Sequence, residues 1–208
     1  MDIDHLVITA TSVETGARAV EAALGVPTEA GGAHPHMGTR NRLLSLGPDT
    51  YLEVIAVDPG APLPGHPRWF GLDAPPAAPR LSNWAARVTD MIRALGEAPM
   101  GMGERRTLSR GDLSWDMAIP QSGTWPFDGV VPALLSWTGA MPQDRLTDRG
   151  CRLQRLLLIH PRMGDLSTAW PRLLDTPRVT GQVGPQPAIV AEIATPTGLK
   201  ILSGALAA

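Results

Sequence analysis

The chain is poor in several residue types that mark common classes of protein. Its 208 residues include one cysteine, Cys151, which excludes an intramolecular disulfide and a cysteine-cluster zinc site. Lysine occurs once, at Lys200, and the other basic side chains are scattered arginines. With a net charge of −2 at pH 7, this pattern gives no reason to expect a nucleic-acid partner or an anionic membrane surface as a partner.

Long apolar segments are also lacking. No run is long enough to cross a bilayer, and the chain opens with Asp2 and Asp4 rather than with a charged segment followed by an apolar core. We therefore expect a soluble cytoplasmic protein. Apolar residues make up 43% of the chain, which is enough for the core of one domain over residues 1–208.

The apolar patterns follow a repeated order of strand, helix, irregular segment, strand and strand. This order fits residues 1–57, where Ser12 caps the predicted helix and Gly25 ends it. Two weaker repeats cover residues 81–138 and 151–204, and a proline-rich crossover, residues 58–80, follows the first unit. The first unit is predicted as strand 3–9, helix 13–24, loop 29–38, strand 39–46 and strand 50–57.

Two ionisable residues stand in predicted apolar strands. Glu53 lies within Tyr51–Val57, and His5 lies within Ile3–Thr9. A carboxylate is costly to bury unless it is paired, binds a ligand or takes part in chemistry. A His and a Glu on two strands of one small unit indicate a polar site inside a cavity.

Three segments carry a resemblance to a known family: Ile3–Val7, Gly31–Asn41 and Tyr51–Ile55. Together they are similar to the glyoxalase-like group of the vicinal oxygen chelate superfamily (glyoxalase, bleomycin resistance and dioxygenase proteins). The resemblance implies an α+β fold in which repeated βαβββ units form a curled, half-open mixed β-sheet around a cavity, with helices outside.

The resemblance also implies a divalent metal with His5 and Glu53 as ligands. In metal-dependent members, a His on the first strand of a unit and a Glu on its last strand bind the ion. The second unit normally supplies the remaining ligands, but here the corresponding strands hold Trp84 or Ala85 and Leu134–Ser136, with no carboxylate. The implied site is therefore incomplete, because catalytic sites usually have three protein ligands.

Each candidate has a plain structural alternative. His5 is either a core histidine bonded to the backbone or a cavity-lining residue. Glu53 is a metal ligand or a general base, or else it forms a salt bridge to Arg40 or Arg42 on the neighbouring strand. Which neighbour shares its face depends on the hairpin register, which the sequence does not fix.

Further candidates follow from the loop and the strand after it. His34 is the preferred third polar group, as a ligand or as a substrate contact, whereas His36 is expected in solvent. Thr39 and Asn41 are candidate substrate-binding residues, and Trp84 is the candidate cavity wall among the tryptophans. Glu192 is either a second cavity acid or a partner of Arg155.

Three functions remain open at this point. The first is a small-molecule enzyme of lyase, isomerase or dioxygenase type, with Glu53 and His5 as catalytic residues and a metal assisting. The second is a metal-free protein that binds or sequesters a small molecule in an apolar pocket. The third is a structural or partner-binding domain, which leaves Glu53 and His5 with no role beyond an ion pair. A homodimer is also considered, although no interface signature marks one.

Overall fold

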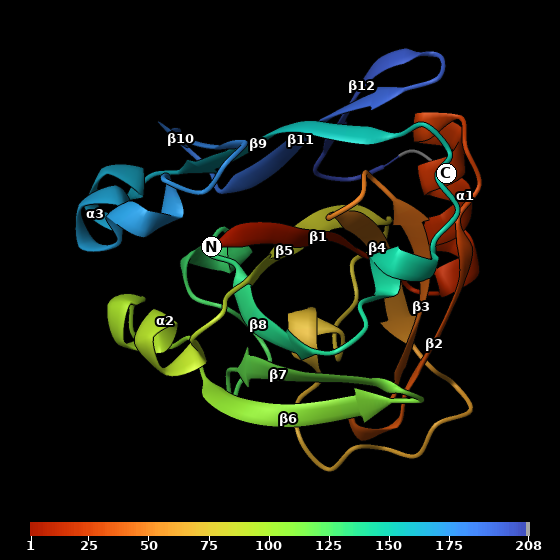
Figure 1. Cartoon of the computed structure of the whole chain (residues 1–208), viewed down its shortest axis with the longest axis horizontal. Helices are drawn as coiled ribbons and strands as arrows, with labels where there is room; N and C mark the ends of the chain where they lie inside the picture. The colour runs from red at the N-terminus through yellow and green to blue at the C-terminus, as the bar shows by residue number, and fades with distance from the viewer. Residues whose placement is uncertain (207–208) are drawn as a thin grey trace.

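The computed structural model describes residues 1–206. They form one eight-stranded sheet and one four-stranded sheet, with three α-helices packed around them (Figure 1). The eight-stranded sheet curls into a half-barrel, and this confirms the expected α+β architecture. No helix in the described part of the chain is both long and apolar enough to cross a membrane.

The first half of the large sheet matches most of the predicted elements. Its elements are β1 (Asp2–Thr9), α1 (Val13–Leu24), β2 (Glu29–His34), β3 (Thr39–Ser45) and β4 (Tyr51–Val57). The expected loop over residues 29–38 is wrong in part, because β2 and a 3₁₀ turn at Pro35–Met37 occupy it. Its glycines hide the strand, since Gly31 and Gly32 lack the β-branched side chains that mark strands.

The second half repeats this order. Its elements are β5 (Arg80–Arg87), α2 (Met91–Glu97), β6 (Glu104–Arg110), β7 (Leu113–Ile119) and β8 (Ala133–Thr138). The strand order across the sheet is β2-β3-β4-β1-β5-β8-β7-β6, so the two halves meet where β1 and β5 pair. In each half the first strand runs parallel to the last strand. The order is therefore the same on both sides of the β1–β5 junction.

Helix α1 explains which face of β4 is turned outward. Ser12 accepts a hydrogen bond from the backbone N–H of Thr15, and Gly25 ends the helix in a left-handed conformation. A Cβ on Gly16 would lie 2.4 Å from Cγ1 of Val54, so this glycine lets the helix approach β4 closely. Because side chains alternate along a strand, Glu53 points to the opposite, concave face.

The third segment forms the second sheet. Its elements are β9 (Arg152–His160), α3 (Met163–Ala169), β10 (Val179–Val183), β11 (Ala188–Thr195) and β12 (Gly198–Ser203). The element order is that of the other two units, but the sheet order is β10-β9-β11-β12, which departs from the expected repeat. This sheet covers β1 and β5 from the outer side, as Figure 1 shows.

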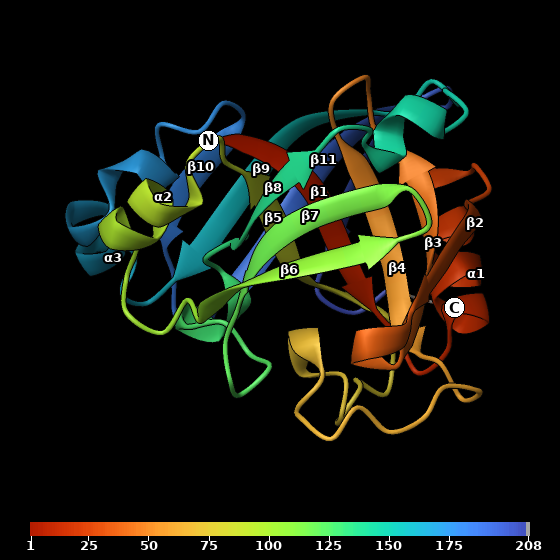
Figure 2. The same cartoon turned by 60° about the horizontal axis from the view of Figure 1, so that its bottom comes forward.

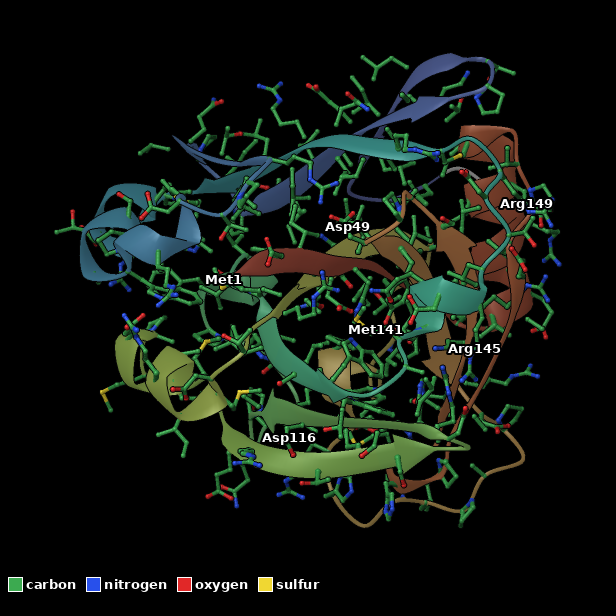
Figure 3. All side chains as sticks on the ribbon, viewed as in Figure 1. Met1, Asp49, Asp116, Met141, Arg145 and Arg149 are labelled. Atoms are coloured by element: carbon green, nitrogen blue, oxygen red, sulfur yellow. The ribbon has the colours of Figure 1, made fainter. Side chains whose placement is uncertain are left out.

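Two long connections hold the parts together. The crossover gathers at one end of the large sheet, below β4 (Figure 2), and Trp69 and Phe70 in its 3₁₀ turn (Trp69–Gly71) are buried. The connection from β8 to β9 runs past the outer edge, where Arg149 lies beside α1 (Figure 3). There, the backbone N–H of Thr147 donates to the carboxylate of Glu29 at 2.9 Å.

Candidate functional site

A small cavity lies on the concave face of the half-barrel. It has a volume of about 30 Å³, which is room for water rather than for a metabolite. Polar side chains come mainly from the first half and apolar ones from the second half and the crossover. The lining residues are His5, His34, Asn41, Tyr51, Glu53, Trp69, Phe70, Arg110, Trp115, Met117, Leu135 and Trp137.

Glu53 is buried in this cavity and has no arginine as an ion-pair partner. Its Oε1 accepts a hydrogen bond from Nδ2 of Asn41 at 2.5 Å, and its Oε2 lies 3.5 Å from Nε2 of His5. The alternative of a salt bridge from Glu53 to Arg40 or Arg42 is wrong, because Arg40 pairs with Glu14, and Arg42 donates to Thr28. The carboxylate is held at one oxygen, and the other faces the imidazole of His5.

The hairpin register determines which residue accompanies Glu53. Asn41 pairs with Ile55, so Asn41 shares the concave face with Glu53 and Arg42 does not. Oδ1 of Asn41 accepts from the backbone N–H of Gly32 at 2.7 Å and from Nη1 of Arg110 at 3.2 Å. These two donors fix the amide so that its nitrogen faces Glu53.

Glycines make room for this arrangement. A Cβ on Gly31 would lie 2.0 Å from Oδ1 of Asn41, and one on Gly32 would lie 2.8 Å from Cδ of Arg110. The same two residues that weaken the strand pattern in the sequence therefore allow Asn41 and Arg110 to approach the backbone of β2.

Arg110 determines the state of His34. Its Nη1 lies 3.0 Å from Nε2 of His34, and because a guanidinium only donates, Nε2 must accept. The ring proton then sits on Nδ1 and points to Oγ1 of Thr39 at 3.2 Å. Burial lowers the pKa of His34 to about 4, and the nearby Arg110 acts in the same direction against the opposing effect of Glu53. His34 is thus a neutral acceptor for Arg110.

His5 is oriented by its neighbour Asp4. Nδ1 of His5 lies 2.8 Å from Oδ1 of Asp4, a fully buried carboxylate whose Oδ2 also accepts from Trp137 at 2.9 Å and from Arg87 at 3.2 Å. A register shift between Ile3 and His5 in the β1–β5 pairing interrupts the regular ladder beside these two residues. Asp4 therefore positions His5 and also links β1 to β8.

Tyr51 forms the floor beside His5. The two rings stack with their centroids 4.7 Å apart. Burial, together with the charges of Asp4 and Glu53, raises the pKa of Tyr51 well above its usual value. The phenol therefore stays protonated and serves as a neutral wall with a hydroxyl group.

The donor set does not fit a tightly held divalent ion. His5 and Glu53 offer two ligands, whereas Nε2 of His34 already accepts from Arg110. The guanidinium of Arg110 also lines the cavity, and its positive charge repels a cation there instead of serving as a third ligand. Within residues 1–206, no three His, Cys, Asp or Glu side chains are grouped so that they could hold a metal.

The structure brings together four of the residues expected at the site: His5, His34, Asn41 and Glu53. Thr39 lies behind them, where its Oγ1 accepts from Nε1 of Trp69 at 3.1 Å.

Trp84 lies elsewhere. It is fully buried in the core, donates to the carbonyl of Val130 at 2.8 Å, and is not among the lining residues, so the expectation that it forms a cavity wall is corrected. Its partner in β1 is Leu6, which neighbours His5 and so lies on the opposite face.

The remaining expectations concern residues outside the cavity. Glu192 lies on β11 of the other sheet and bonds to Nε of Arg155 at 3.1 Å, so it is a partner of Arg155 and not a second cavity acid. His36 is exposed, as expected.

Sequence reasoning missed Arg110 and the positioning role of Asp4. Arg110 ends a strand of mostly polar residues and gives no sign of turning inward. Asp4 does give a sign, since it is a second ionisable residue within an apolar strand.

A model of the glyoxalase-like domain family matches residues 3–174 of this chain. The chain belongs to this family. The match covers both halves of the large sheet, and it confirms the resemblance carried by the segments around His5, His34 and Glu53.

Two solved structures show a limited similarity to this chain. Methylmalonyl-CoA epimerase from Mycobacterium tuberculosis is 18% identical, with a TM-score of 0.40, over 67% of this chain and 89% of that chain. A triple mutant of 4-hydroxymandelate synthase from Streptomyces coelicolor is 15% identical, with a TM-score of 0.47, over 97% of this chain and 62% of that chain. No curated protein matches.

Proposed function

We propose that this glyoxalase-like domain is a small-molecule enzyme that removes a proton from a carbon atom next to a carbonyl group of its substrate. Glu53 is the base, His5 is the second proton-transfer group, and Arg110 binds the oxygen that becomes negative. One observation carries the proposal. Within residues 1–206, a buried carboxylate that pairs with no arginine borders the same cavity as a guanidinium, and Asn41 hydrogen-bonds to both.

The chemistry follows from the roles of these groups. Glu53 accepts the proton through the oxygen that Asn41 does not occupy, and the electron pair of the broken C–H bond moves to the carbonyl oxygen. Arg110 donates to this oxygen, and preorganised donors aimed at developing charge are the most effective kind in a dry site. Delivery of a proton to the opposite face of that carbon, or to the neighbouring carbon of an enediolate, gives an isomerase. Loss of a leaving group from the neighbouring carbon gives a lyase.

The first half thus supplies Glu53 and His5, the second half supplies Arg110, and Trp115, Met117 and Leu135 form the apolar side of the cavity. The dioxygenase alternative needs a redox metal, for which this donor set offers two ligands. A substrate must also displace a wall of the cavity, because 30 Å³ does not hold a metabolite.

Exchange of carbon-bound hydrogen with D₂O tests the proposal without knowledge of the product. A panel of 2-oxo acids and α-hydroxy ketones is incubated with the protein in D₂O and followed by proton NMR. We expect exchange with at least one panel member, and we expect Glu53→Gln to slow it by about 100-fold or more. The matched control is Glu14→Gln, since Glu14 is exposed and pairs with Arg40 on the other face.

A second candidate function is metal-free binding without turnover. The aromatic walls formed by Trp69, Phe70, Trp115 and Trp137 favour it. If panel members bind stoichiometrically by calorimetry but no hydrogen exchanges in the wild type, the catalytic proposal is wrong and sequestration replaces it.

A further inference from the structure

A second, much larger cavity lies on the other side of Phe70. This groove has a volume of about 880 Å³, within the range of ligand sites. Its walls come from β5, from the crossover and from the connection between β7 and β8, with Pro187 at its edge. Phe70 lines both cavities, so the groove and the site of Glu53 are separate spaces with one shared side chain.

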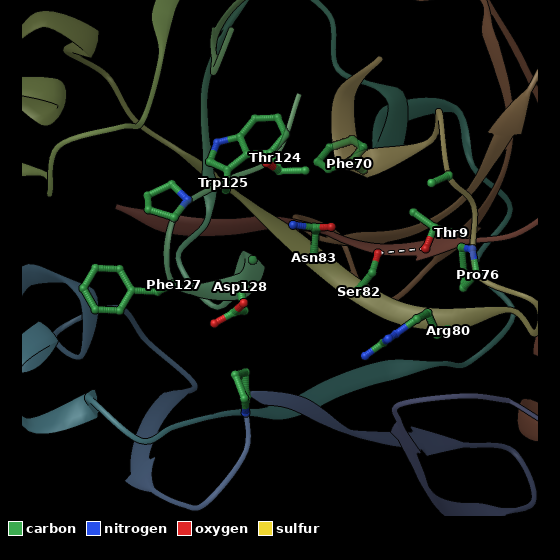
Figure 4. A pocket seen from close by; sticks show the side chains of 15 residues that line it. Thr9, Phe70, Pro76, Arg80, Ser82, Asn83, Thr124, Trp125, Phe127 and Asp128 are labelled. Carbon is green, nitrogen blue, oxygen red and sulfur yellow. Dashed lines mark hydrogen bonds between the residues drawn. The ribbon is translucent and has the colours of Figure 1, made fainter. Parts of the chain in front are cut away.

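Asn83 is a buried polar residue that lines this groove. It pairs with Val7 in the β1–β5 ladder and is 7% exposed. In Figure 4 its amide projects from β5 into the groove. Its side chain makes no hydrogen bond to any group within residues 1–206. The protein does not enclose the amide atoms, so their unused donor and acceptor can bind a ligand in the groove.

The nearby hydroxyls do not serve Asn83. Oγ1 of Thr9 donates to Oγ of Ser82 at 3.1 Å, so these two groups satisfy each other (Figure 4). Gly129 lets the neighbouring loop close over the amide, since a Cβ there would lie 2.6 Å from Nδ2 of Asn83. The amide is therefore held in a tight place but keeps its hydrogen-bonding capacity.

Three aromatic side chains line part of the groove beside the amide. The rings of Phe70 and Trp125 stack with centroids 5.0 Å apart, and Phe127 forms a further wall. Two charged residues, Arg80 and Asp128, also line the groove, on the other side of Asn83 from Trp125 (Figure 4). The Asn83 amide thus adds one neutral donor and one neutral acceptor beside this aromatic surface.

We propose that this groove binds a neutral planar ring that carries a lactam edge, held by Asn83 and stacked on the aromatic walls. An asparagine amide presents a donor beside an acceptor, which matches the N–H and C=O of a lactam in two hydrogen bonds. Aromatic walls favour a flat ring. This site is independent of the proton-transfer chemistry at Glu53.

Isothermal titration calorimetry with 1(2H)-isoquinolinone tests this site. We expect saturable binding to the wild type below 1 mM, and binding weaker by about tenfold or more in Asn83→Leu, because both hydrogen bonds are lost. Asn83→Asp keeps the side-chain shape and should weaken binding similarly, which covers the case in which Asn83→Leu does not fold. The N-methyl analogue, which lacks the donor, should bind as weakly to the wild type as the lactam binds to the variants.

Glu53→Gln separates this proposal from the proposed function, since it should leave isoquinolinone binding unchanged. Two results overturn the inference. One is the absence of binding to the wild type at millimolar probe, and the other is equal affinity in the wild type and the folded Asn83 variants.

Discussion

The two halves of the large sheet share one strand order but differ in chemistry. Glu53 lies two residues beyond Tyr51, the β4 partner of His5. In the second half, Leu135 lies two residues beyond Ala133, the β8 partner of Ala85. Leu135 therefore takes the place of Glu53.

The comparison extends to the neighbouring strands. Asn41 of β3 pairs with Ile55, which lies two residues beyond Glu53 on β4. Trp115 of β7 pairs with Trp137, which lies two residues beyond Leu135 on β8. Asn41 and Trp115 therefore occupy matching positions. Ala85 is the β5 residue that pairs directly with His5. The polar residues His5, Asn41 and Glu53 of the first half are thus matched in the second half by the apolar residues Ala85, Trp115 and Leu135.

This difference shows how one backbone frame holds two kinds of surface. The first half carries the buried titratable groups His5, His34 and Glu53, and the second half carries mostly apolar wall. Arg110 is the exception, since it brings a positive charge from the second half to Asn41 and His34. The fold alone would not reveal this division, because a few inward positions decide it.

The strongest way to break the comparison is to place a carboxylate in the apolar half. Leu135→Glu should lower the free energy of unfolding at pH 7 by about 3 kcal/mol or more, because the new charge is buried without a partner. Urea denaturation measures the change. The matched control is Leu199→Glu, at a residue that is 60% exposed, where we expect a change within about 0.5 kcal/mol. Equal losses of unfolding free energy in the two variants would mean that Leu135 is not buried in an apolar wall of the cavity.

A pH series sharpens the role of His34. Its pKa is lowered from 6.5 to about 4 in the folded protein, so the unfolded chain binds more protons between these values. The contribution of His34 is then complete above pH 6.5 and is lost as the pH falls towards 4, by about 3 kcal/mol in all. Urea denaturation across this range should show a flatter pH dependence in His34→Gln.

His36 provides the control for that series, since it is two residues away and exposed. We expect His36→Gln to follow the wild-type curve. If His34→Gln keeps the full wild-type slope, the buried neutral histidine bonded to Arg110 is not present in solution.

The smallest effect is expected at the other strand glutamate. Glu192 resembles Glu53 in the sequence but forms a partly exposed pair with Arg155. We expect Glu192→Gln to lower the free energy of unfolding by less than about 1 kcal/mol. We also expect this variant to leave the exchange of carbon-bound substrate hydrogen with D₂O unchanged. Loss of exchange in this variant would mean that the chemistry is not confined to the large sheet.

The sequence predicts the fold better than it predicts the site. Helix 13–24 is confirmed at both ends, because Ser12 and Gly25 supply specific caps. The strands of the first half follow from their apolar patterns, apart from the glycine-rich β2. The third segment shows the limit, since element order does not determine which strands pair, and its sheet order differs.

The site depends on contacts that no local pattern contains. The place of Asn41 beside Glu53 requires the hairpin register, which becomes known only from the paired strands. Arg110 meets His34 across a separation of 76 residues. Trp84 looks like a cavity wall by its place in a strand, but the face it occupies depends on register shifts in the β1–β5 pairing.

We propose that Arg110, and not a bound cation, supplies the positive charge in the cavity of Glu53. Calorimetric titration of the chelator-treated protein with Zn²⁺ and Mn²⁺, repeated on Glu53→Gln, tests this proposal. We expect no stoichiometric binding at micromolar concentration in either protein. A stoichiometric ion that binds the wild type tightly and is lost in Glu53→Gln would contradict it.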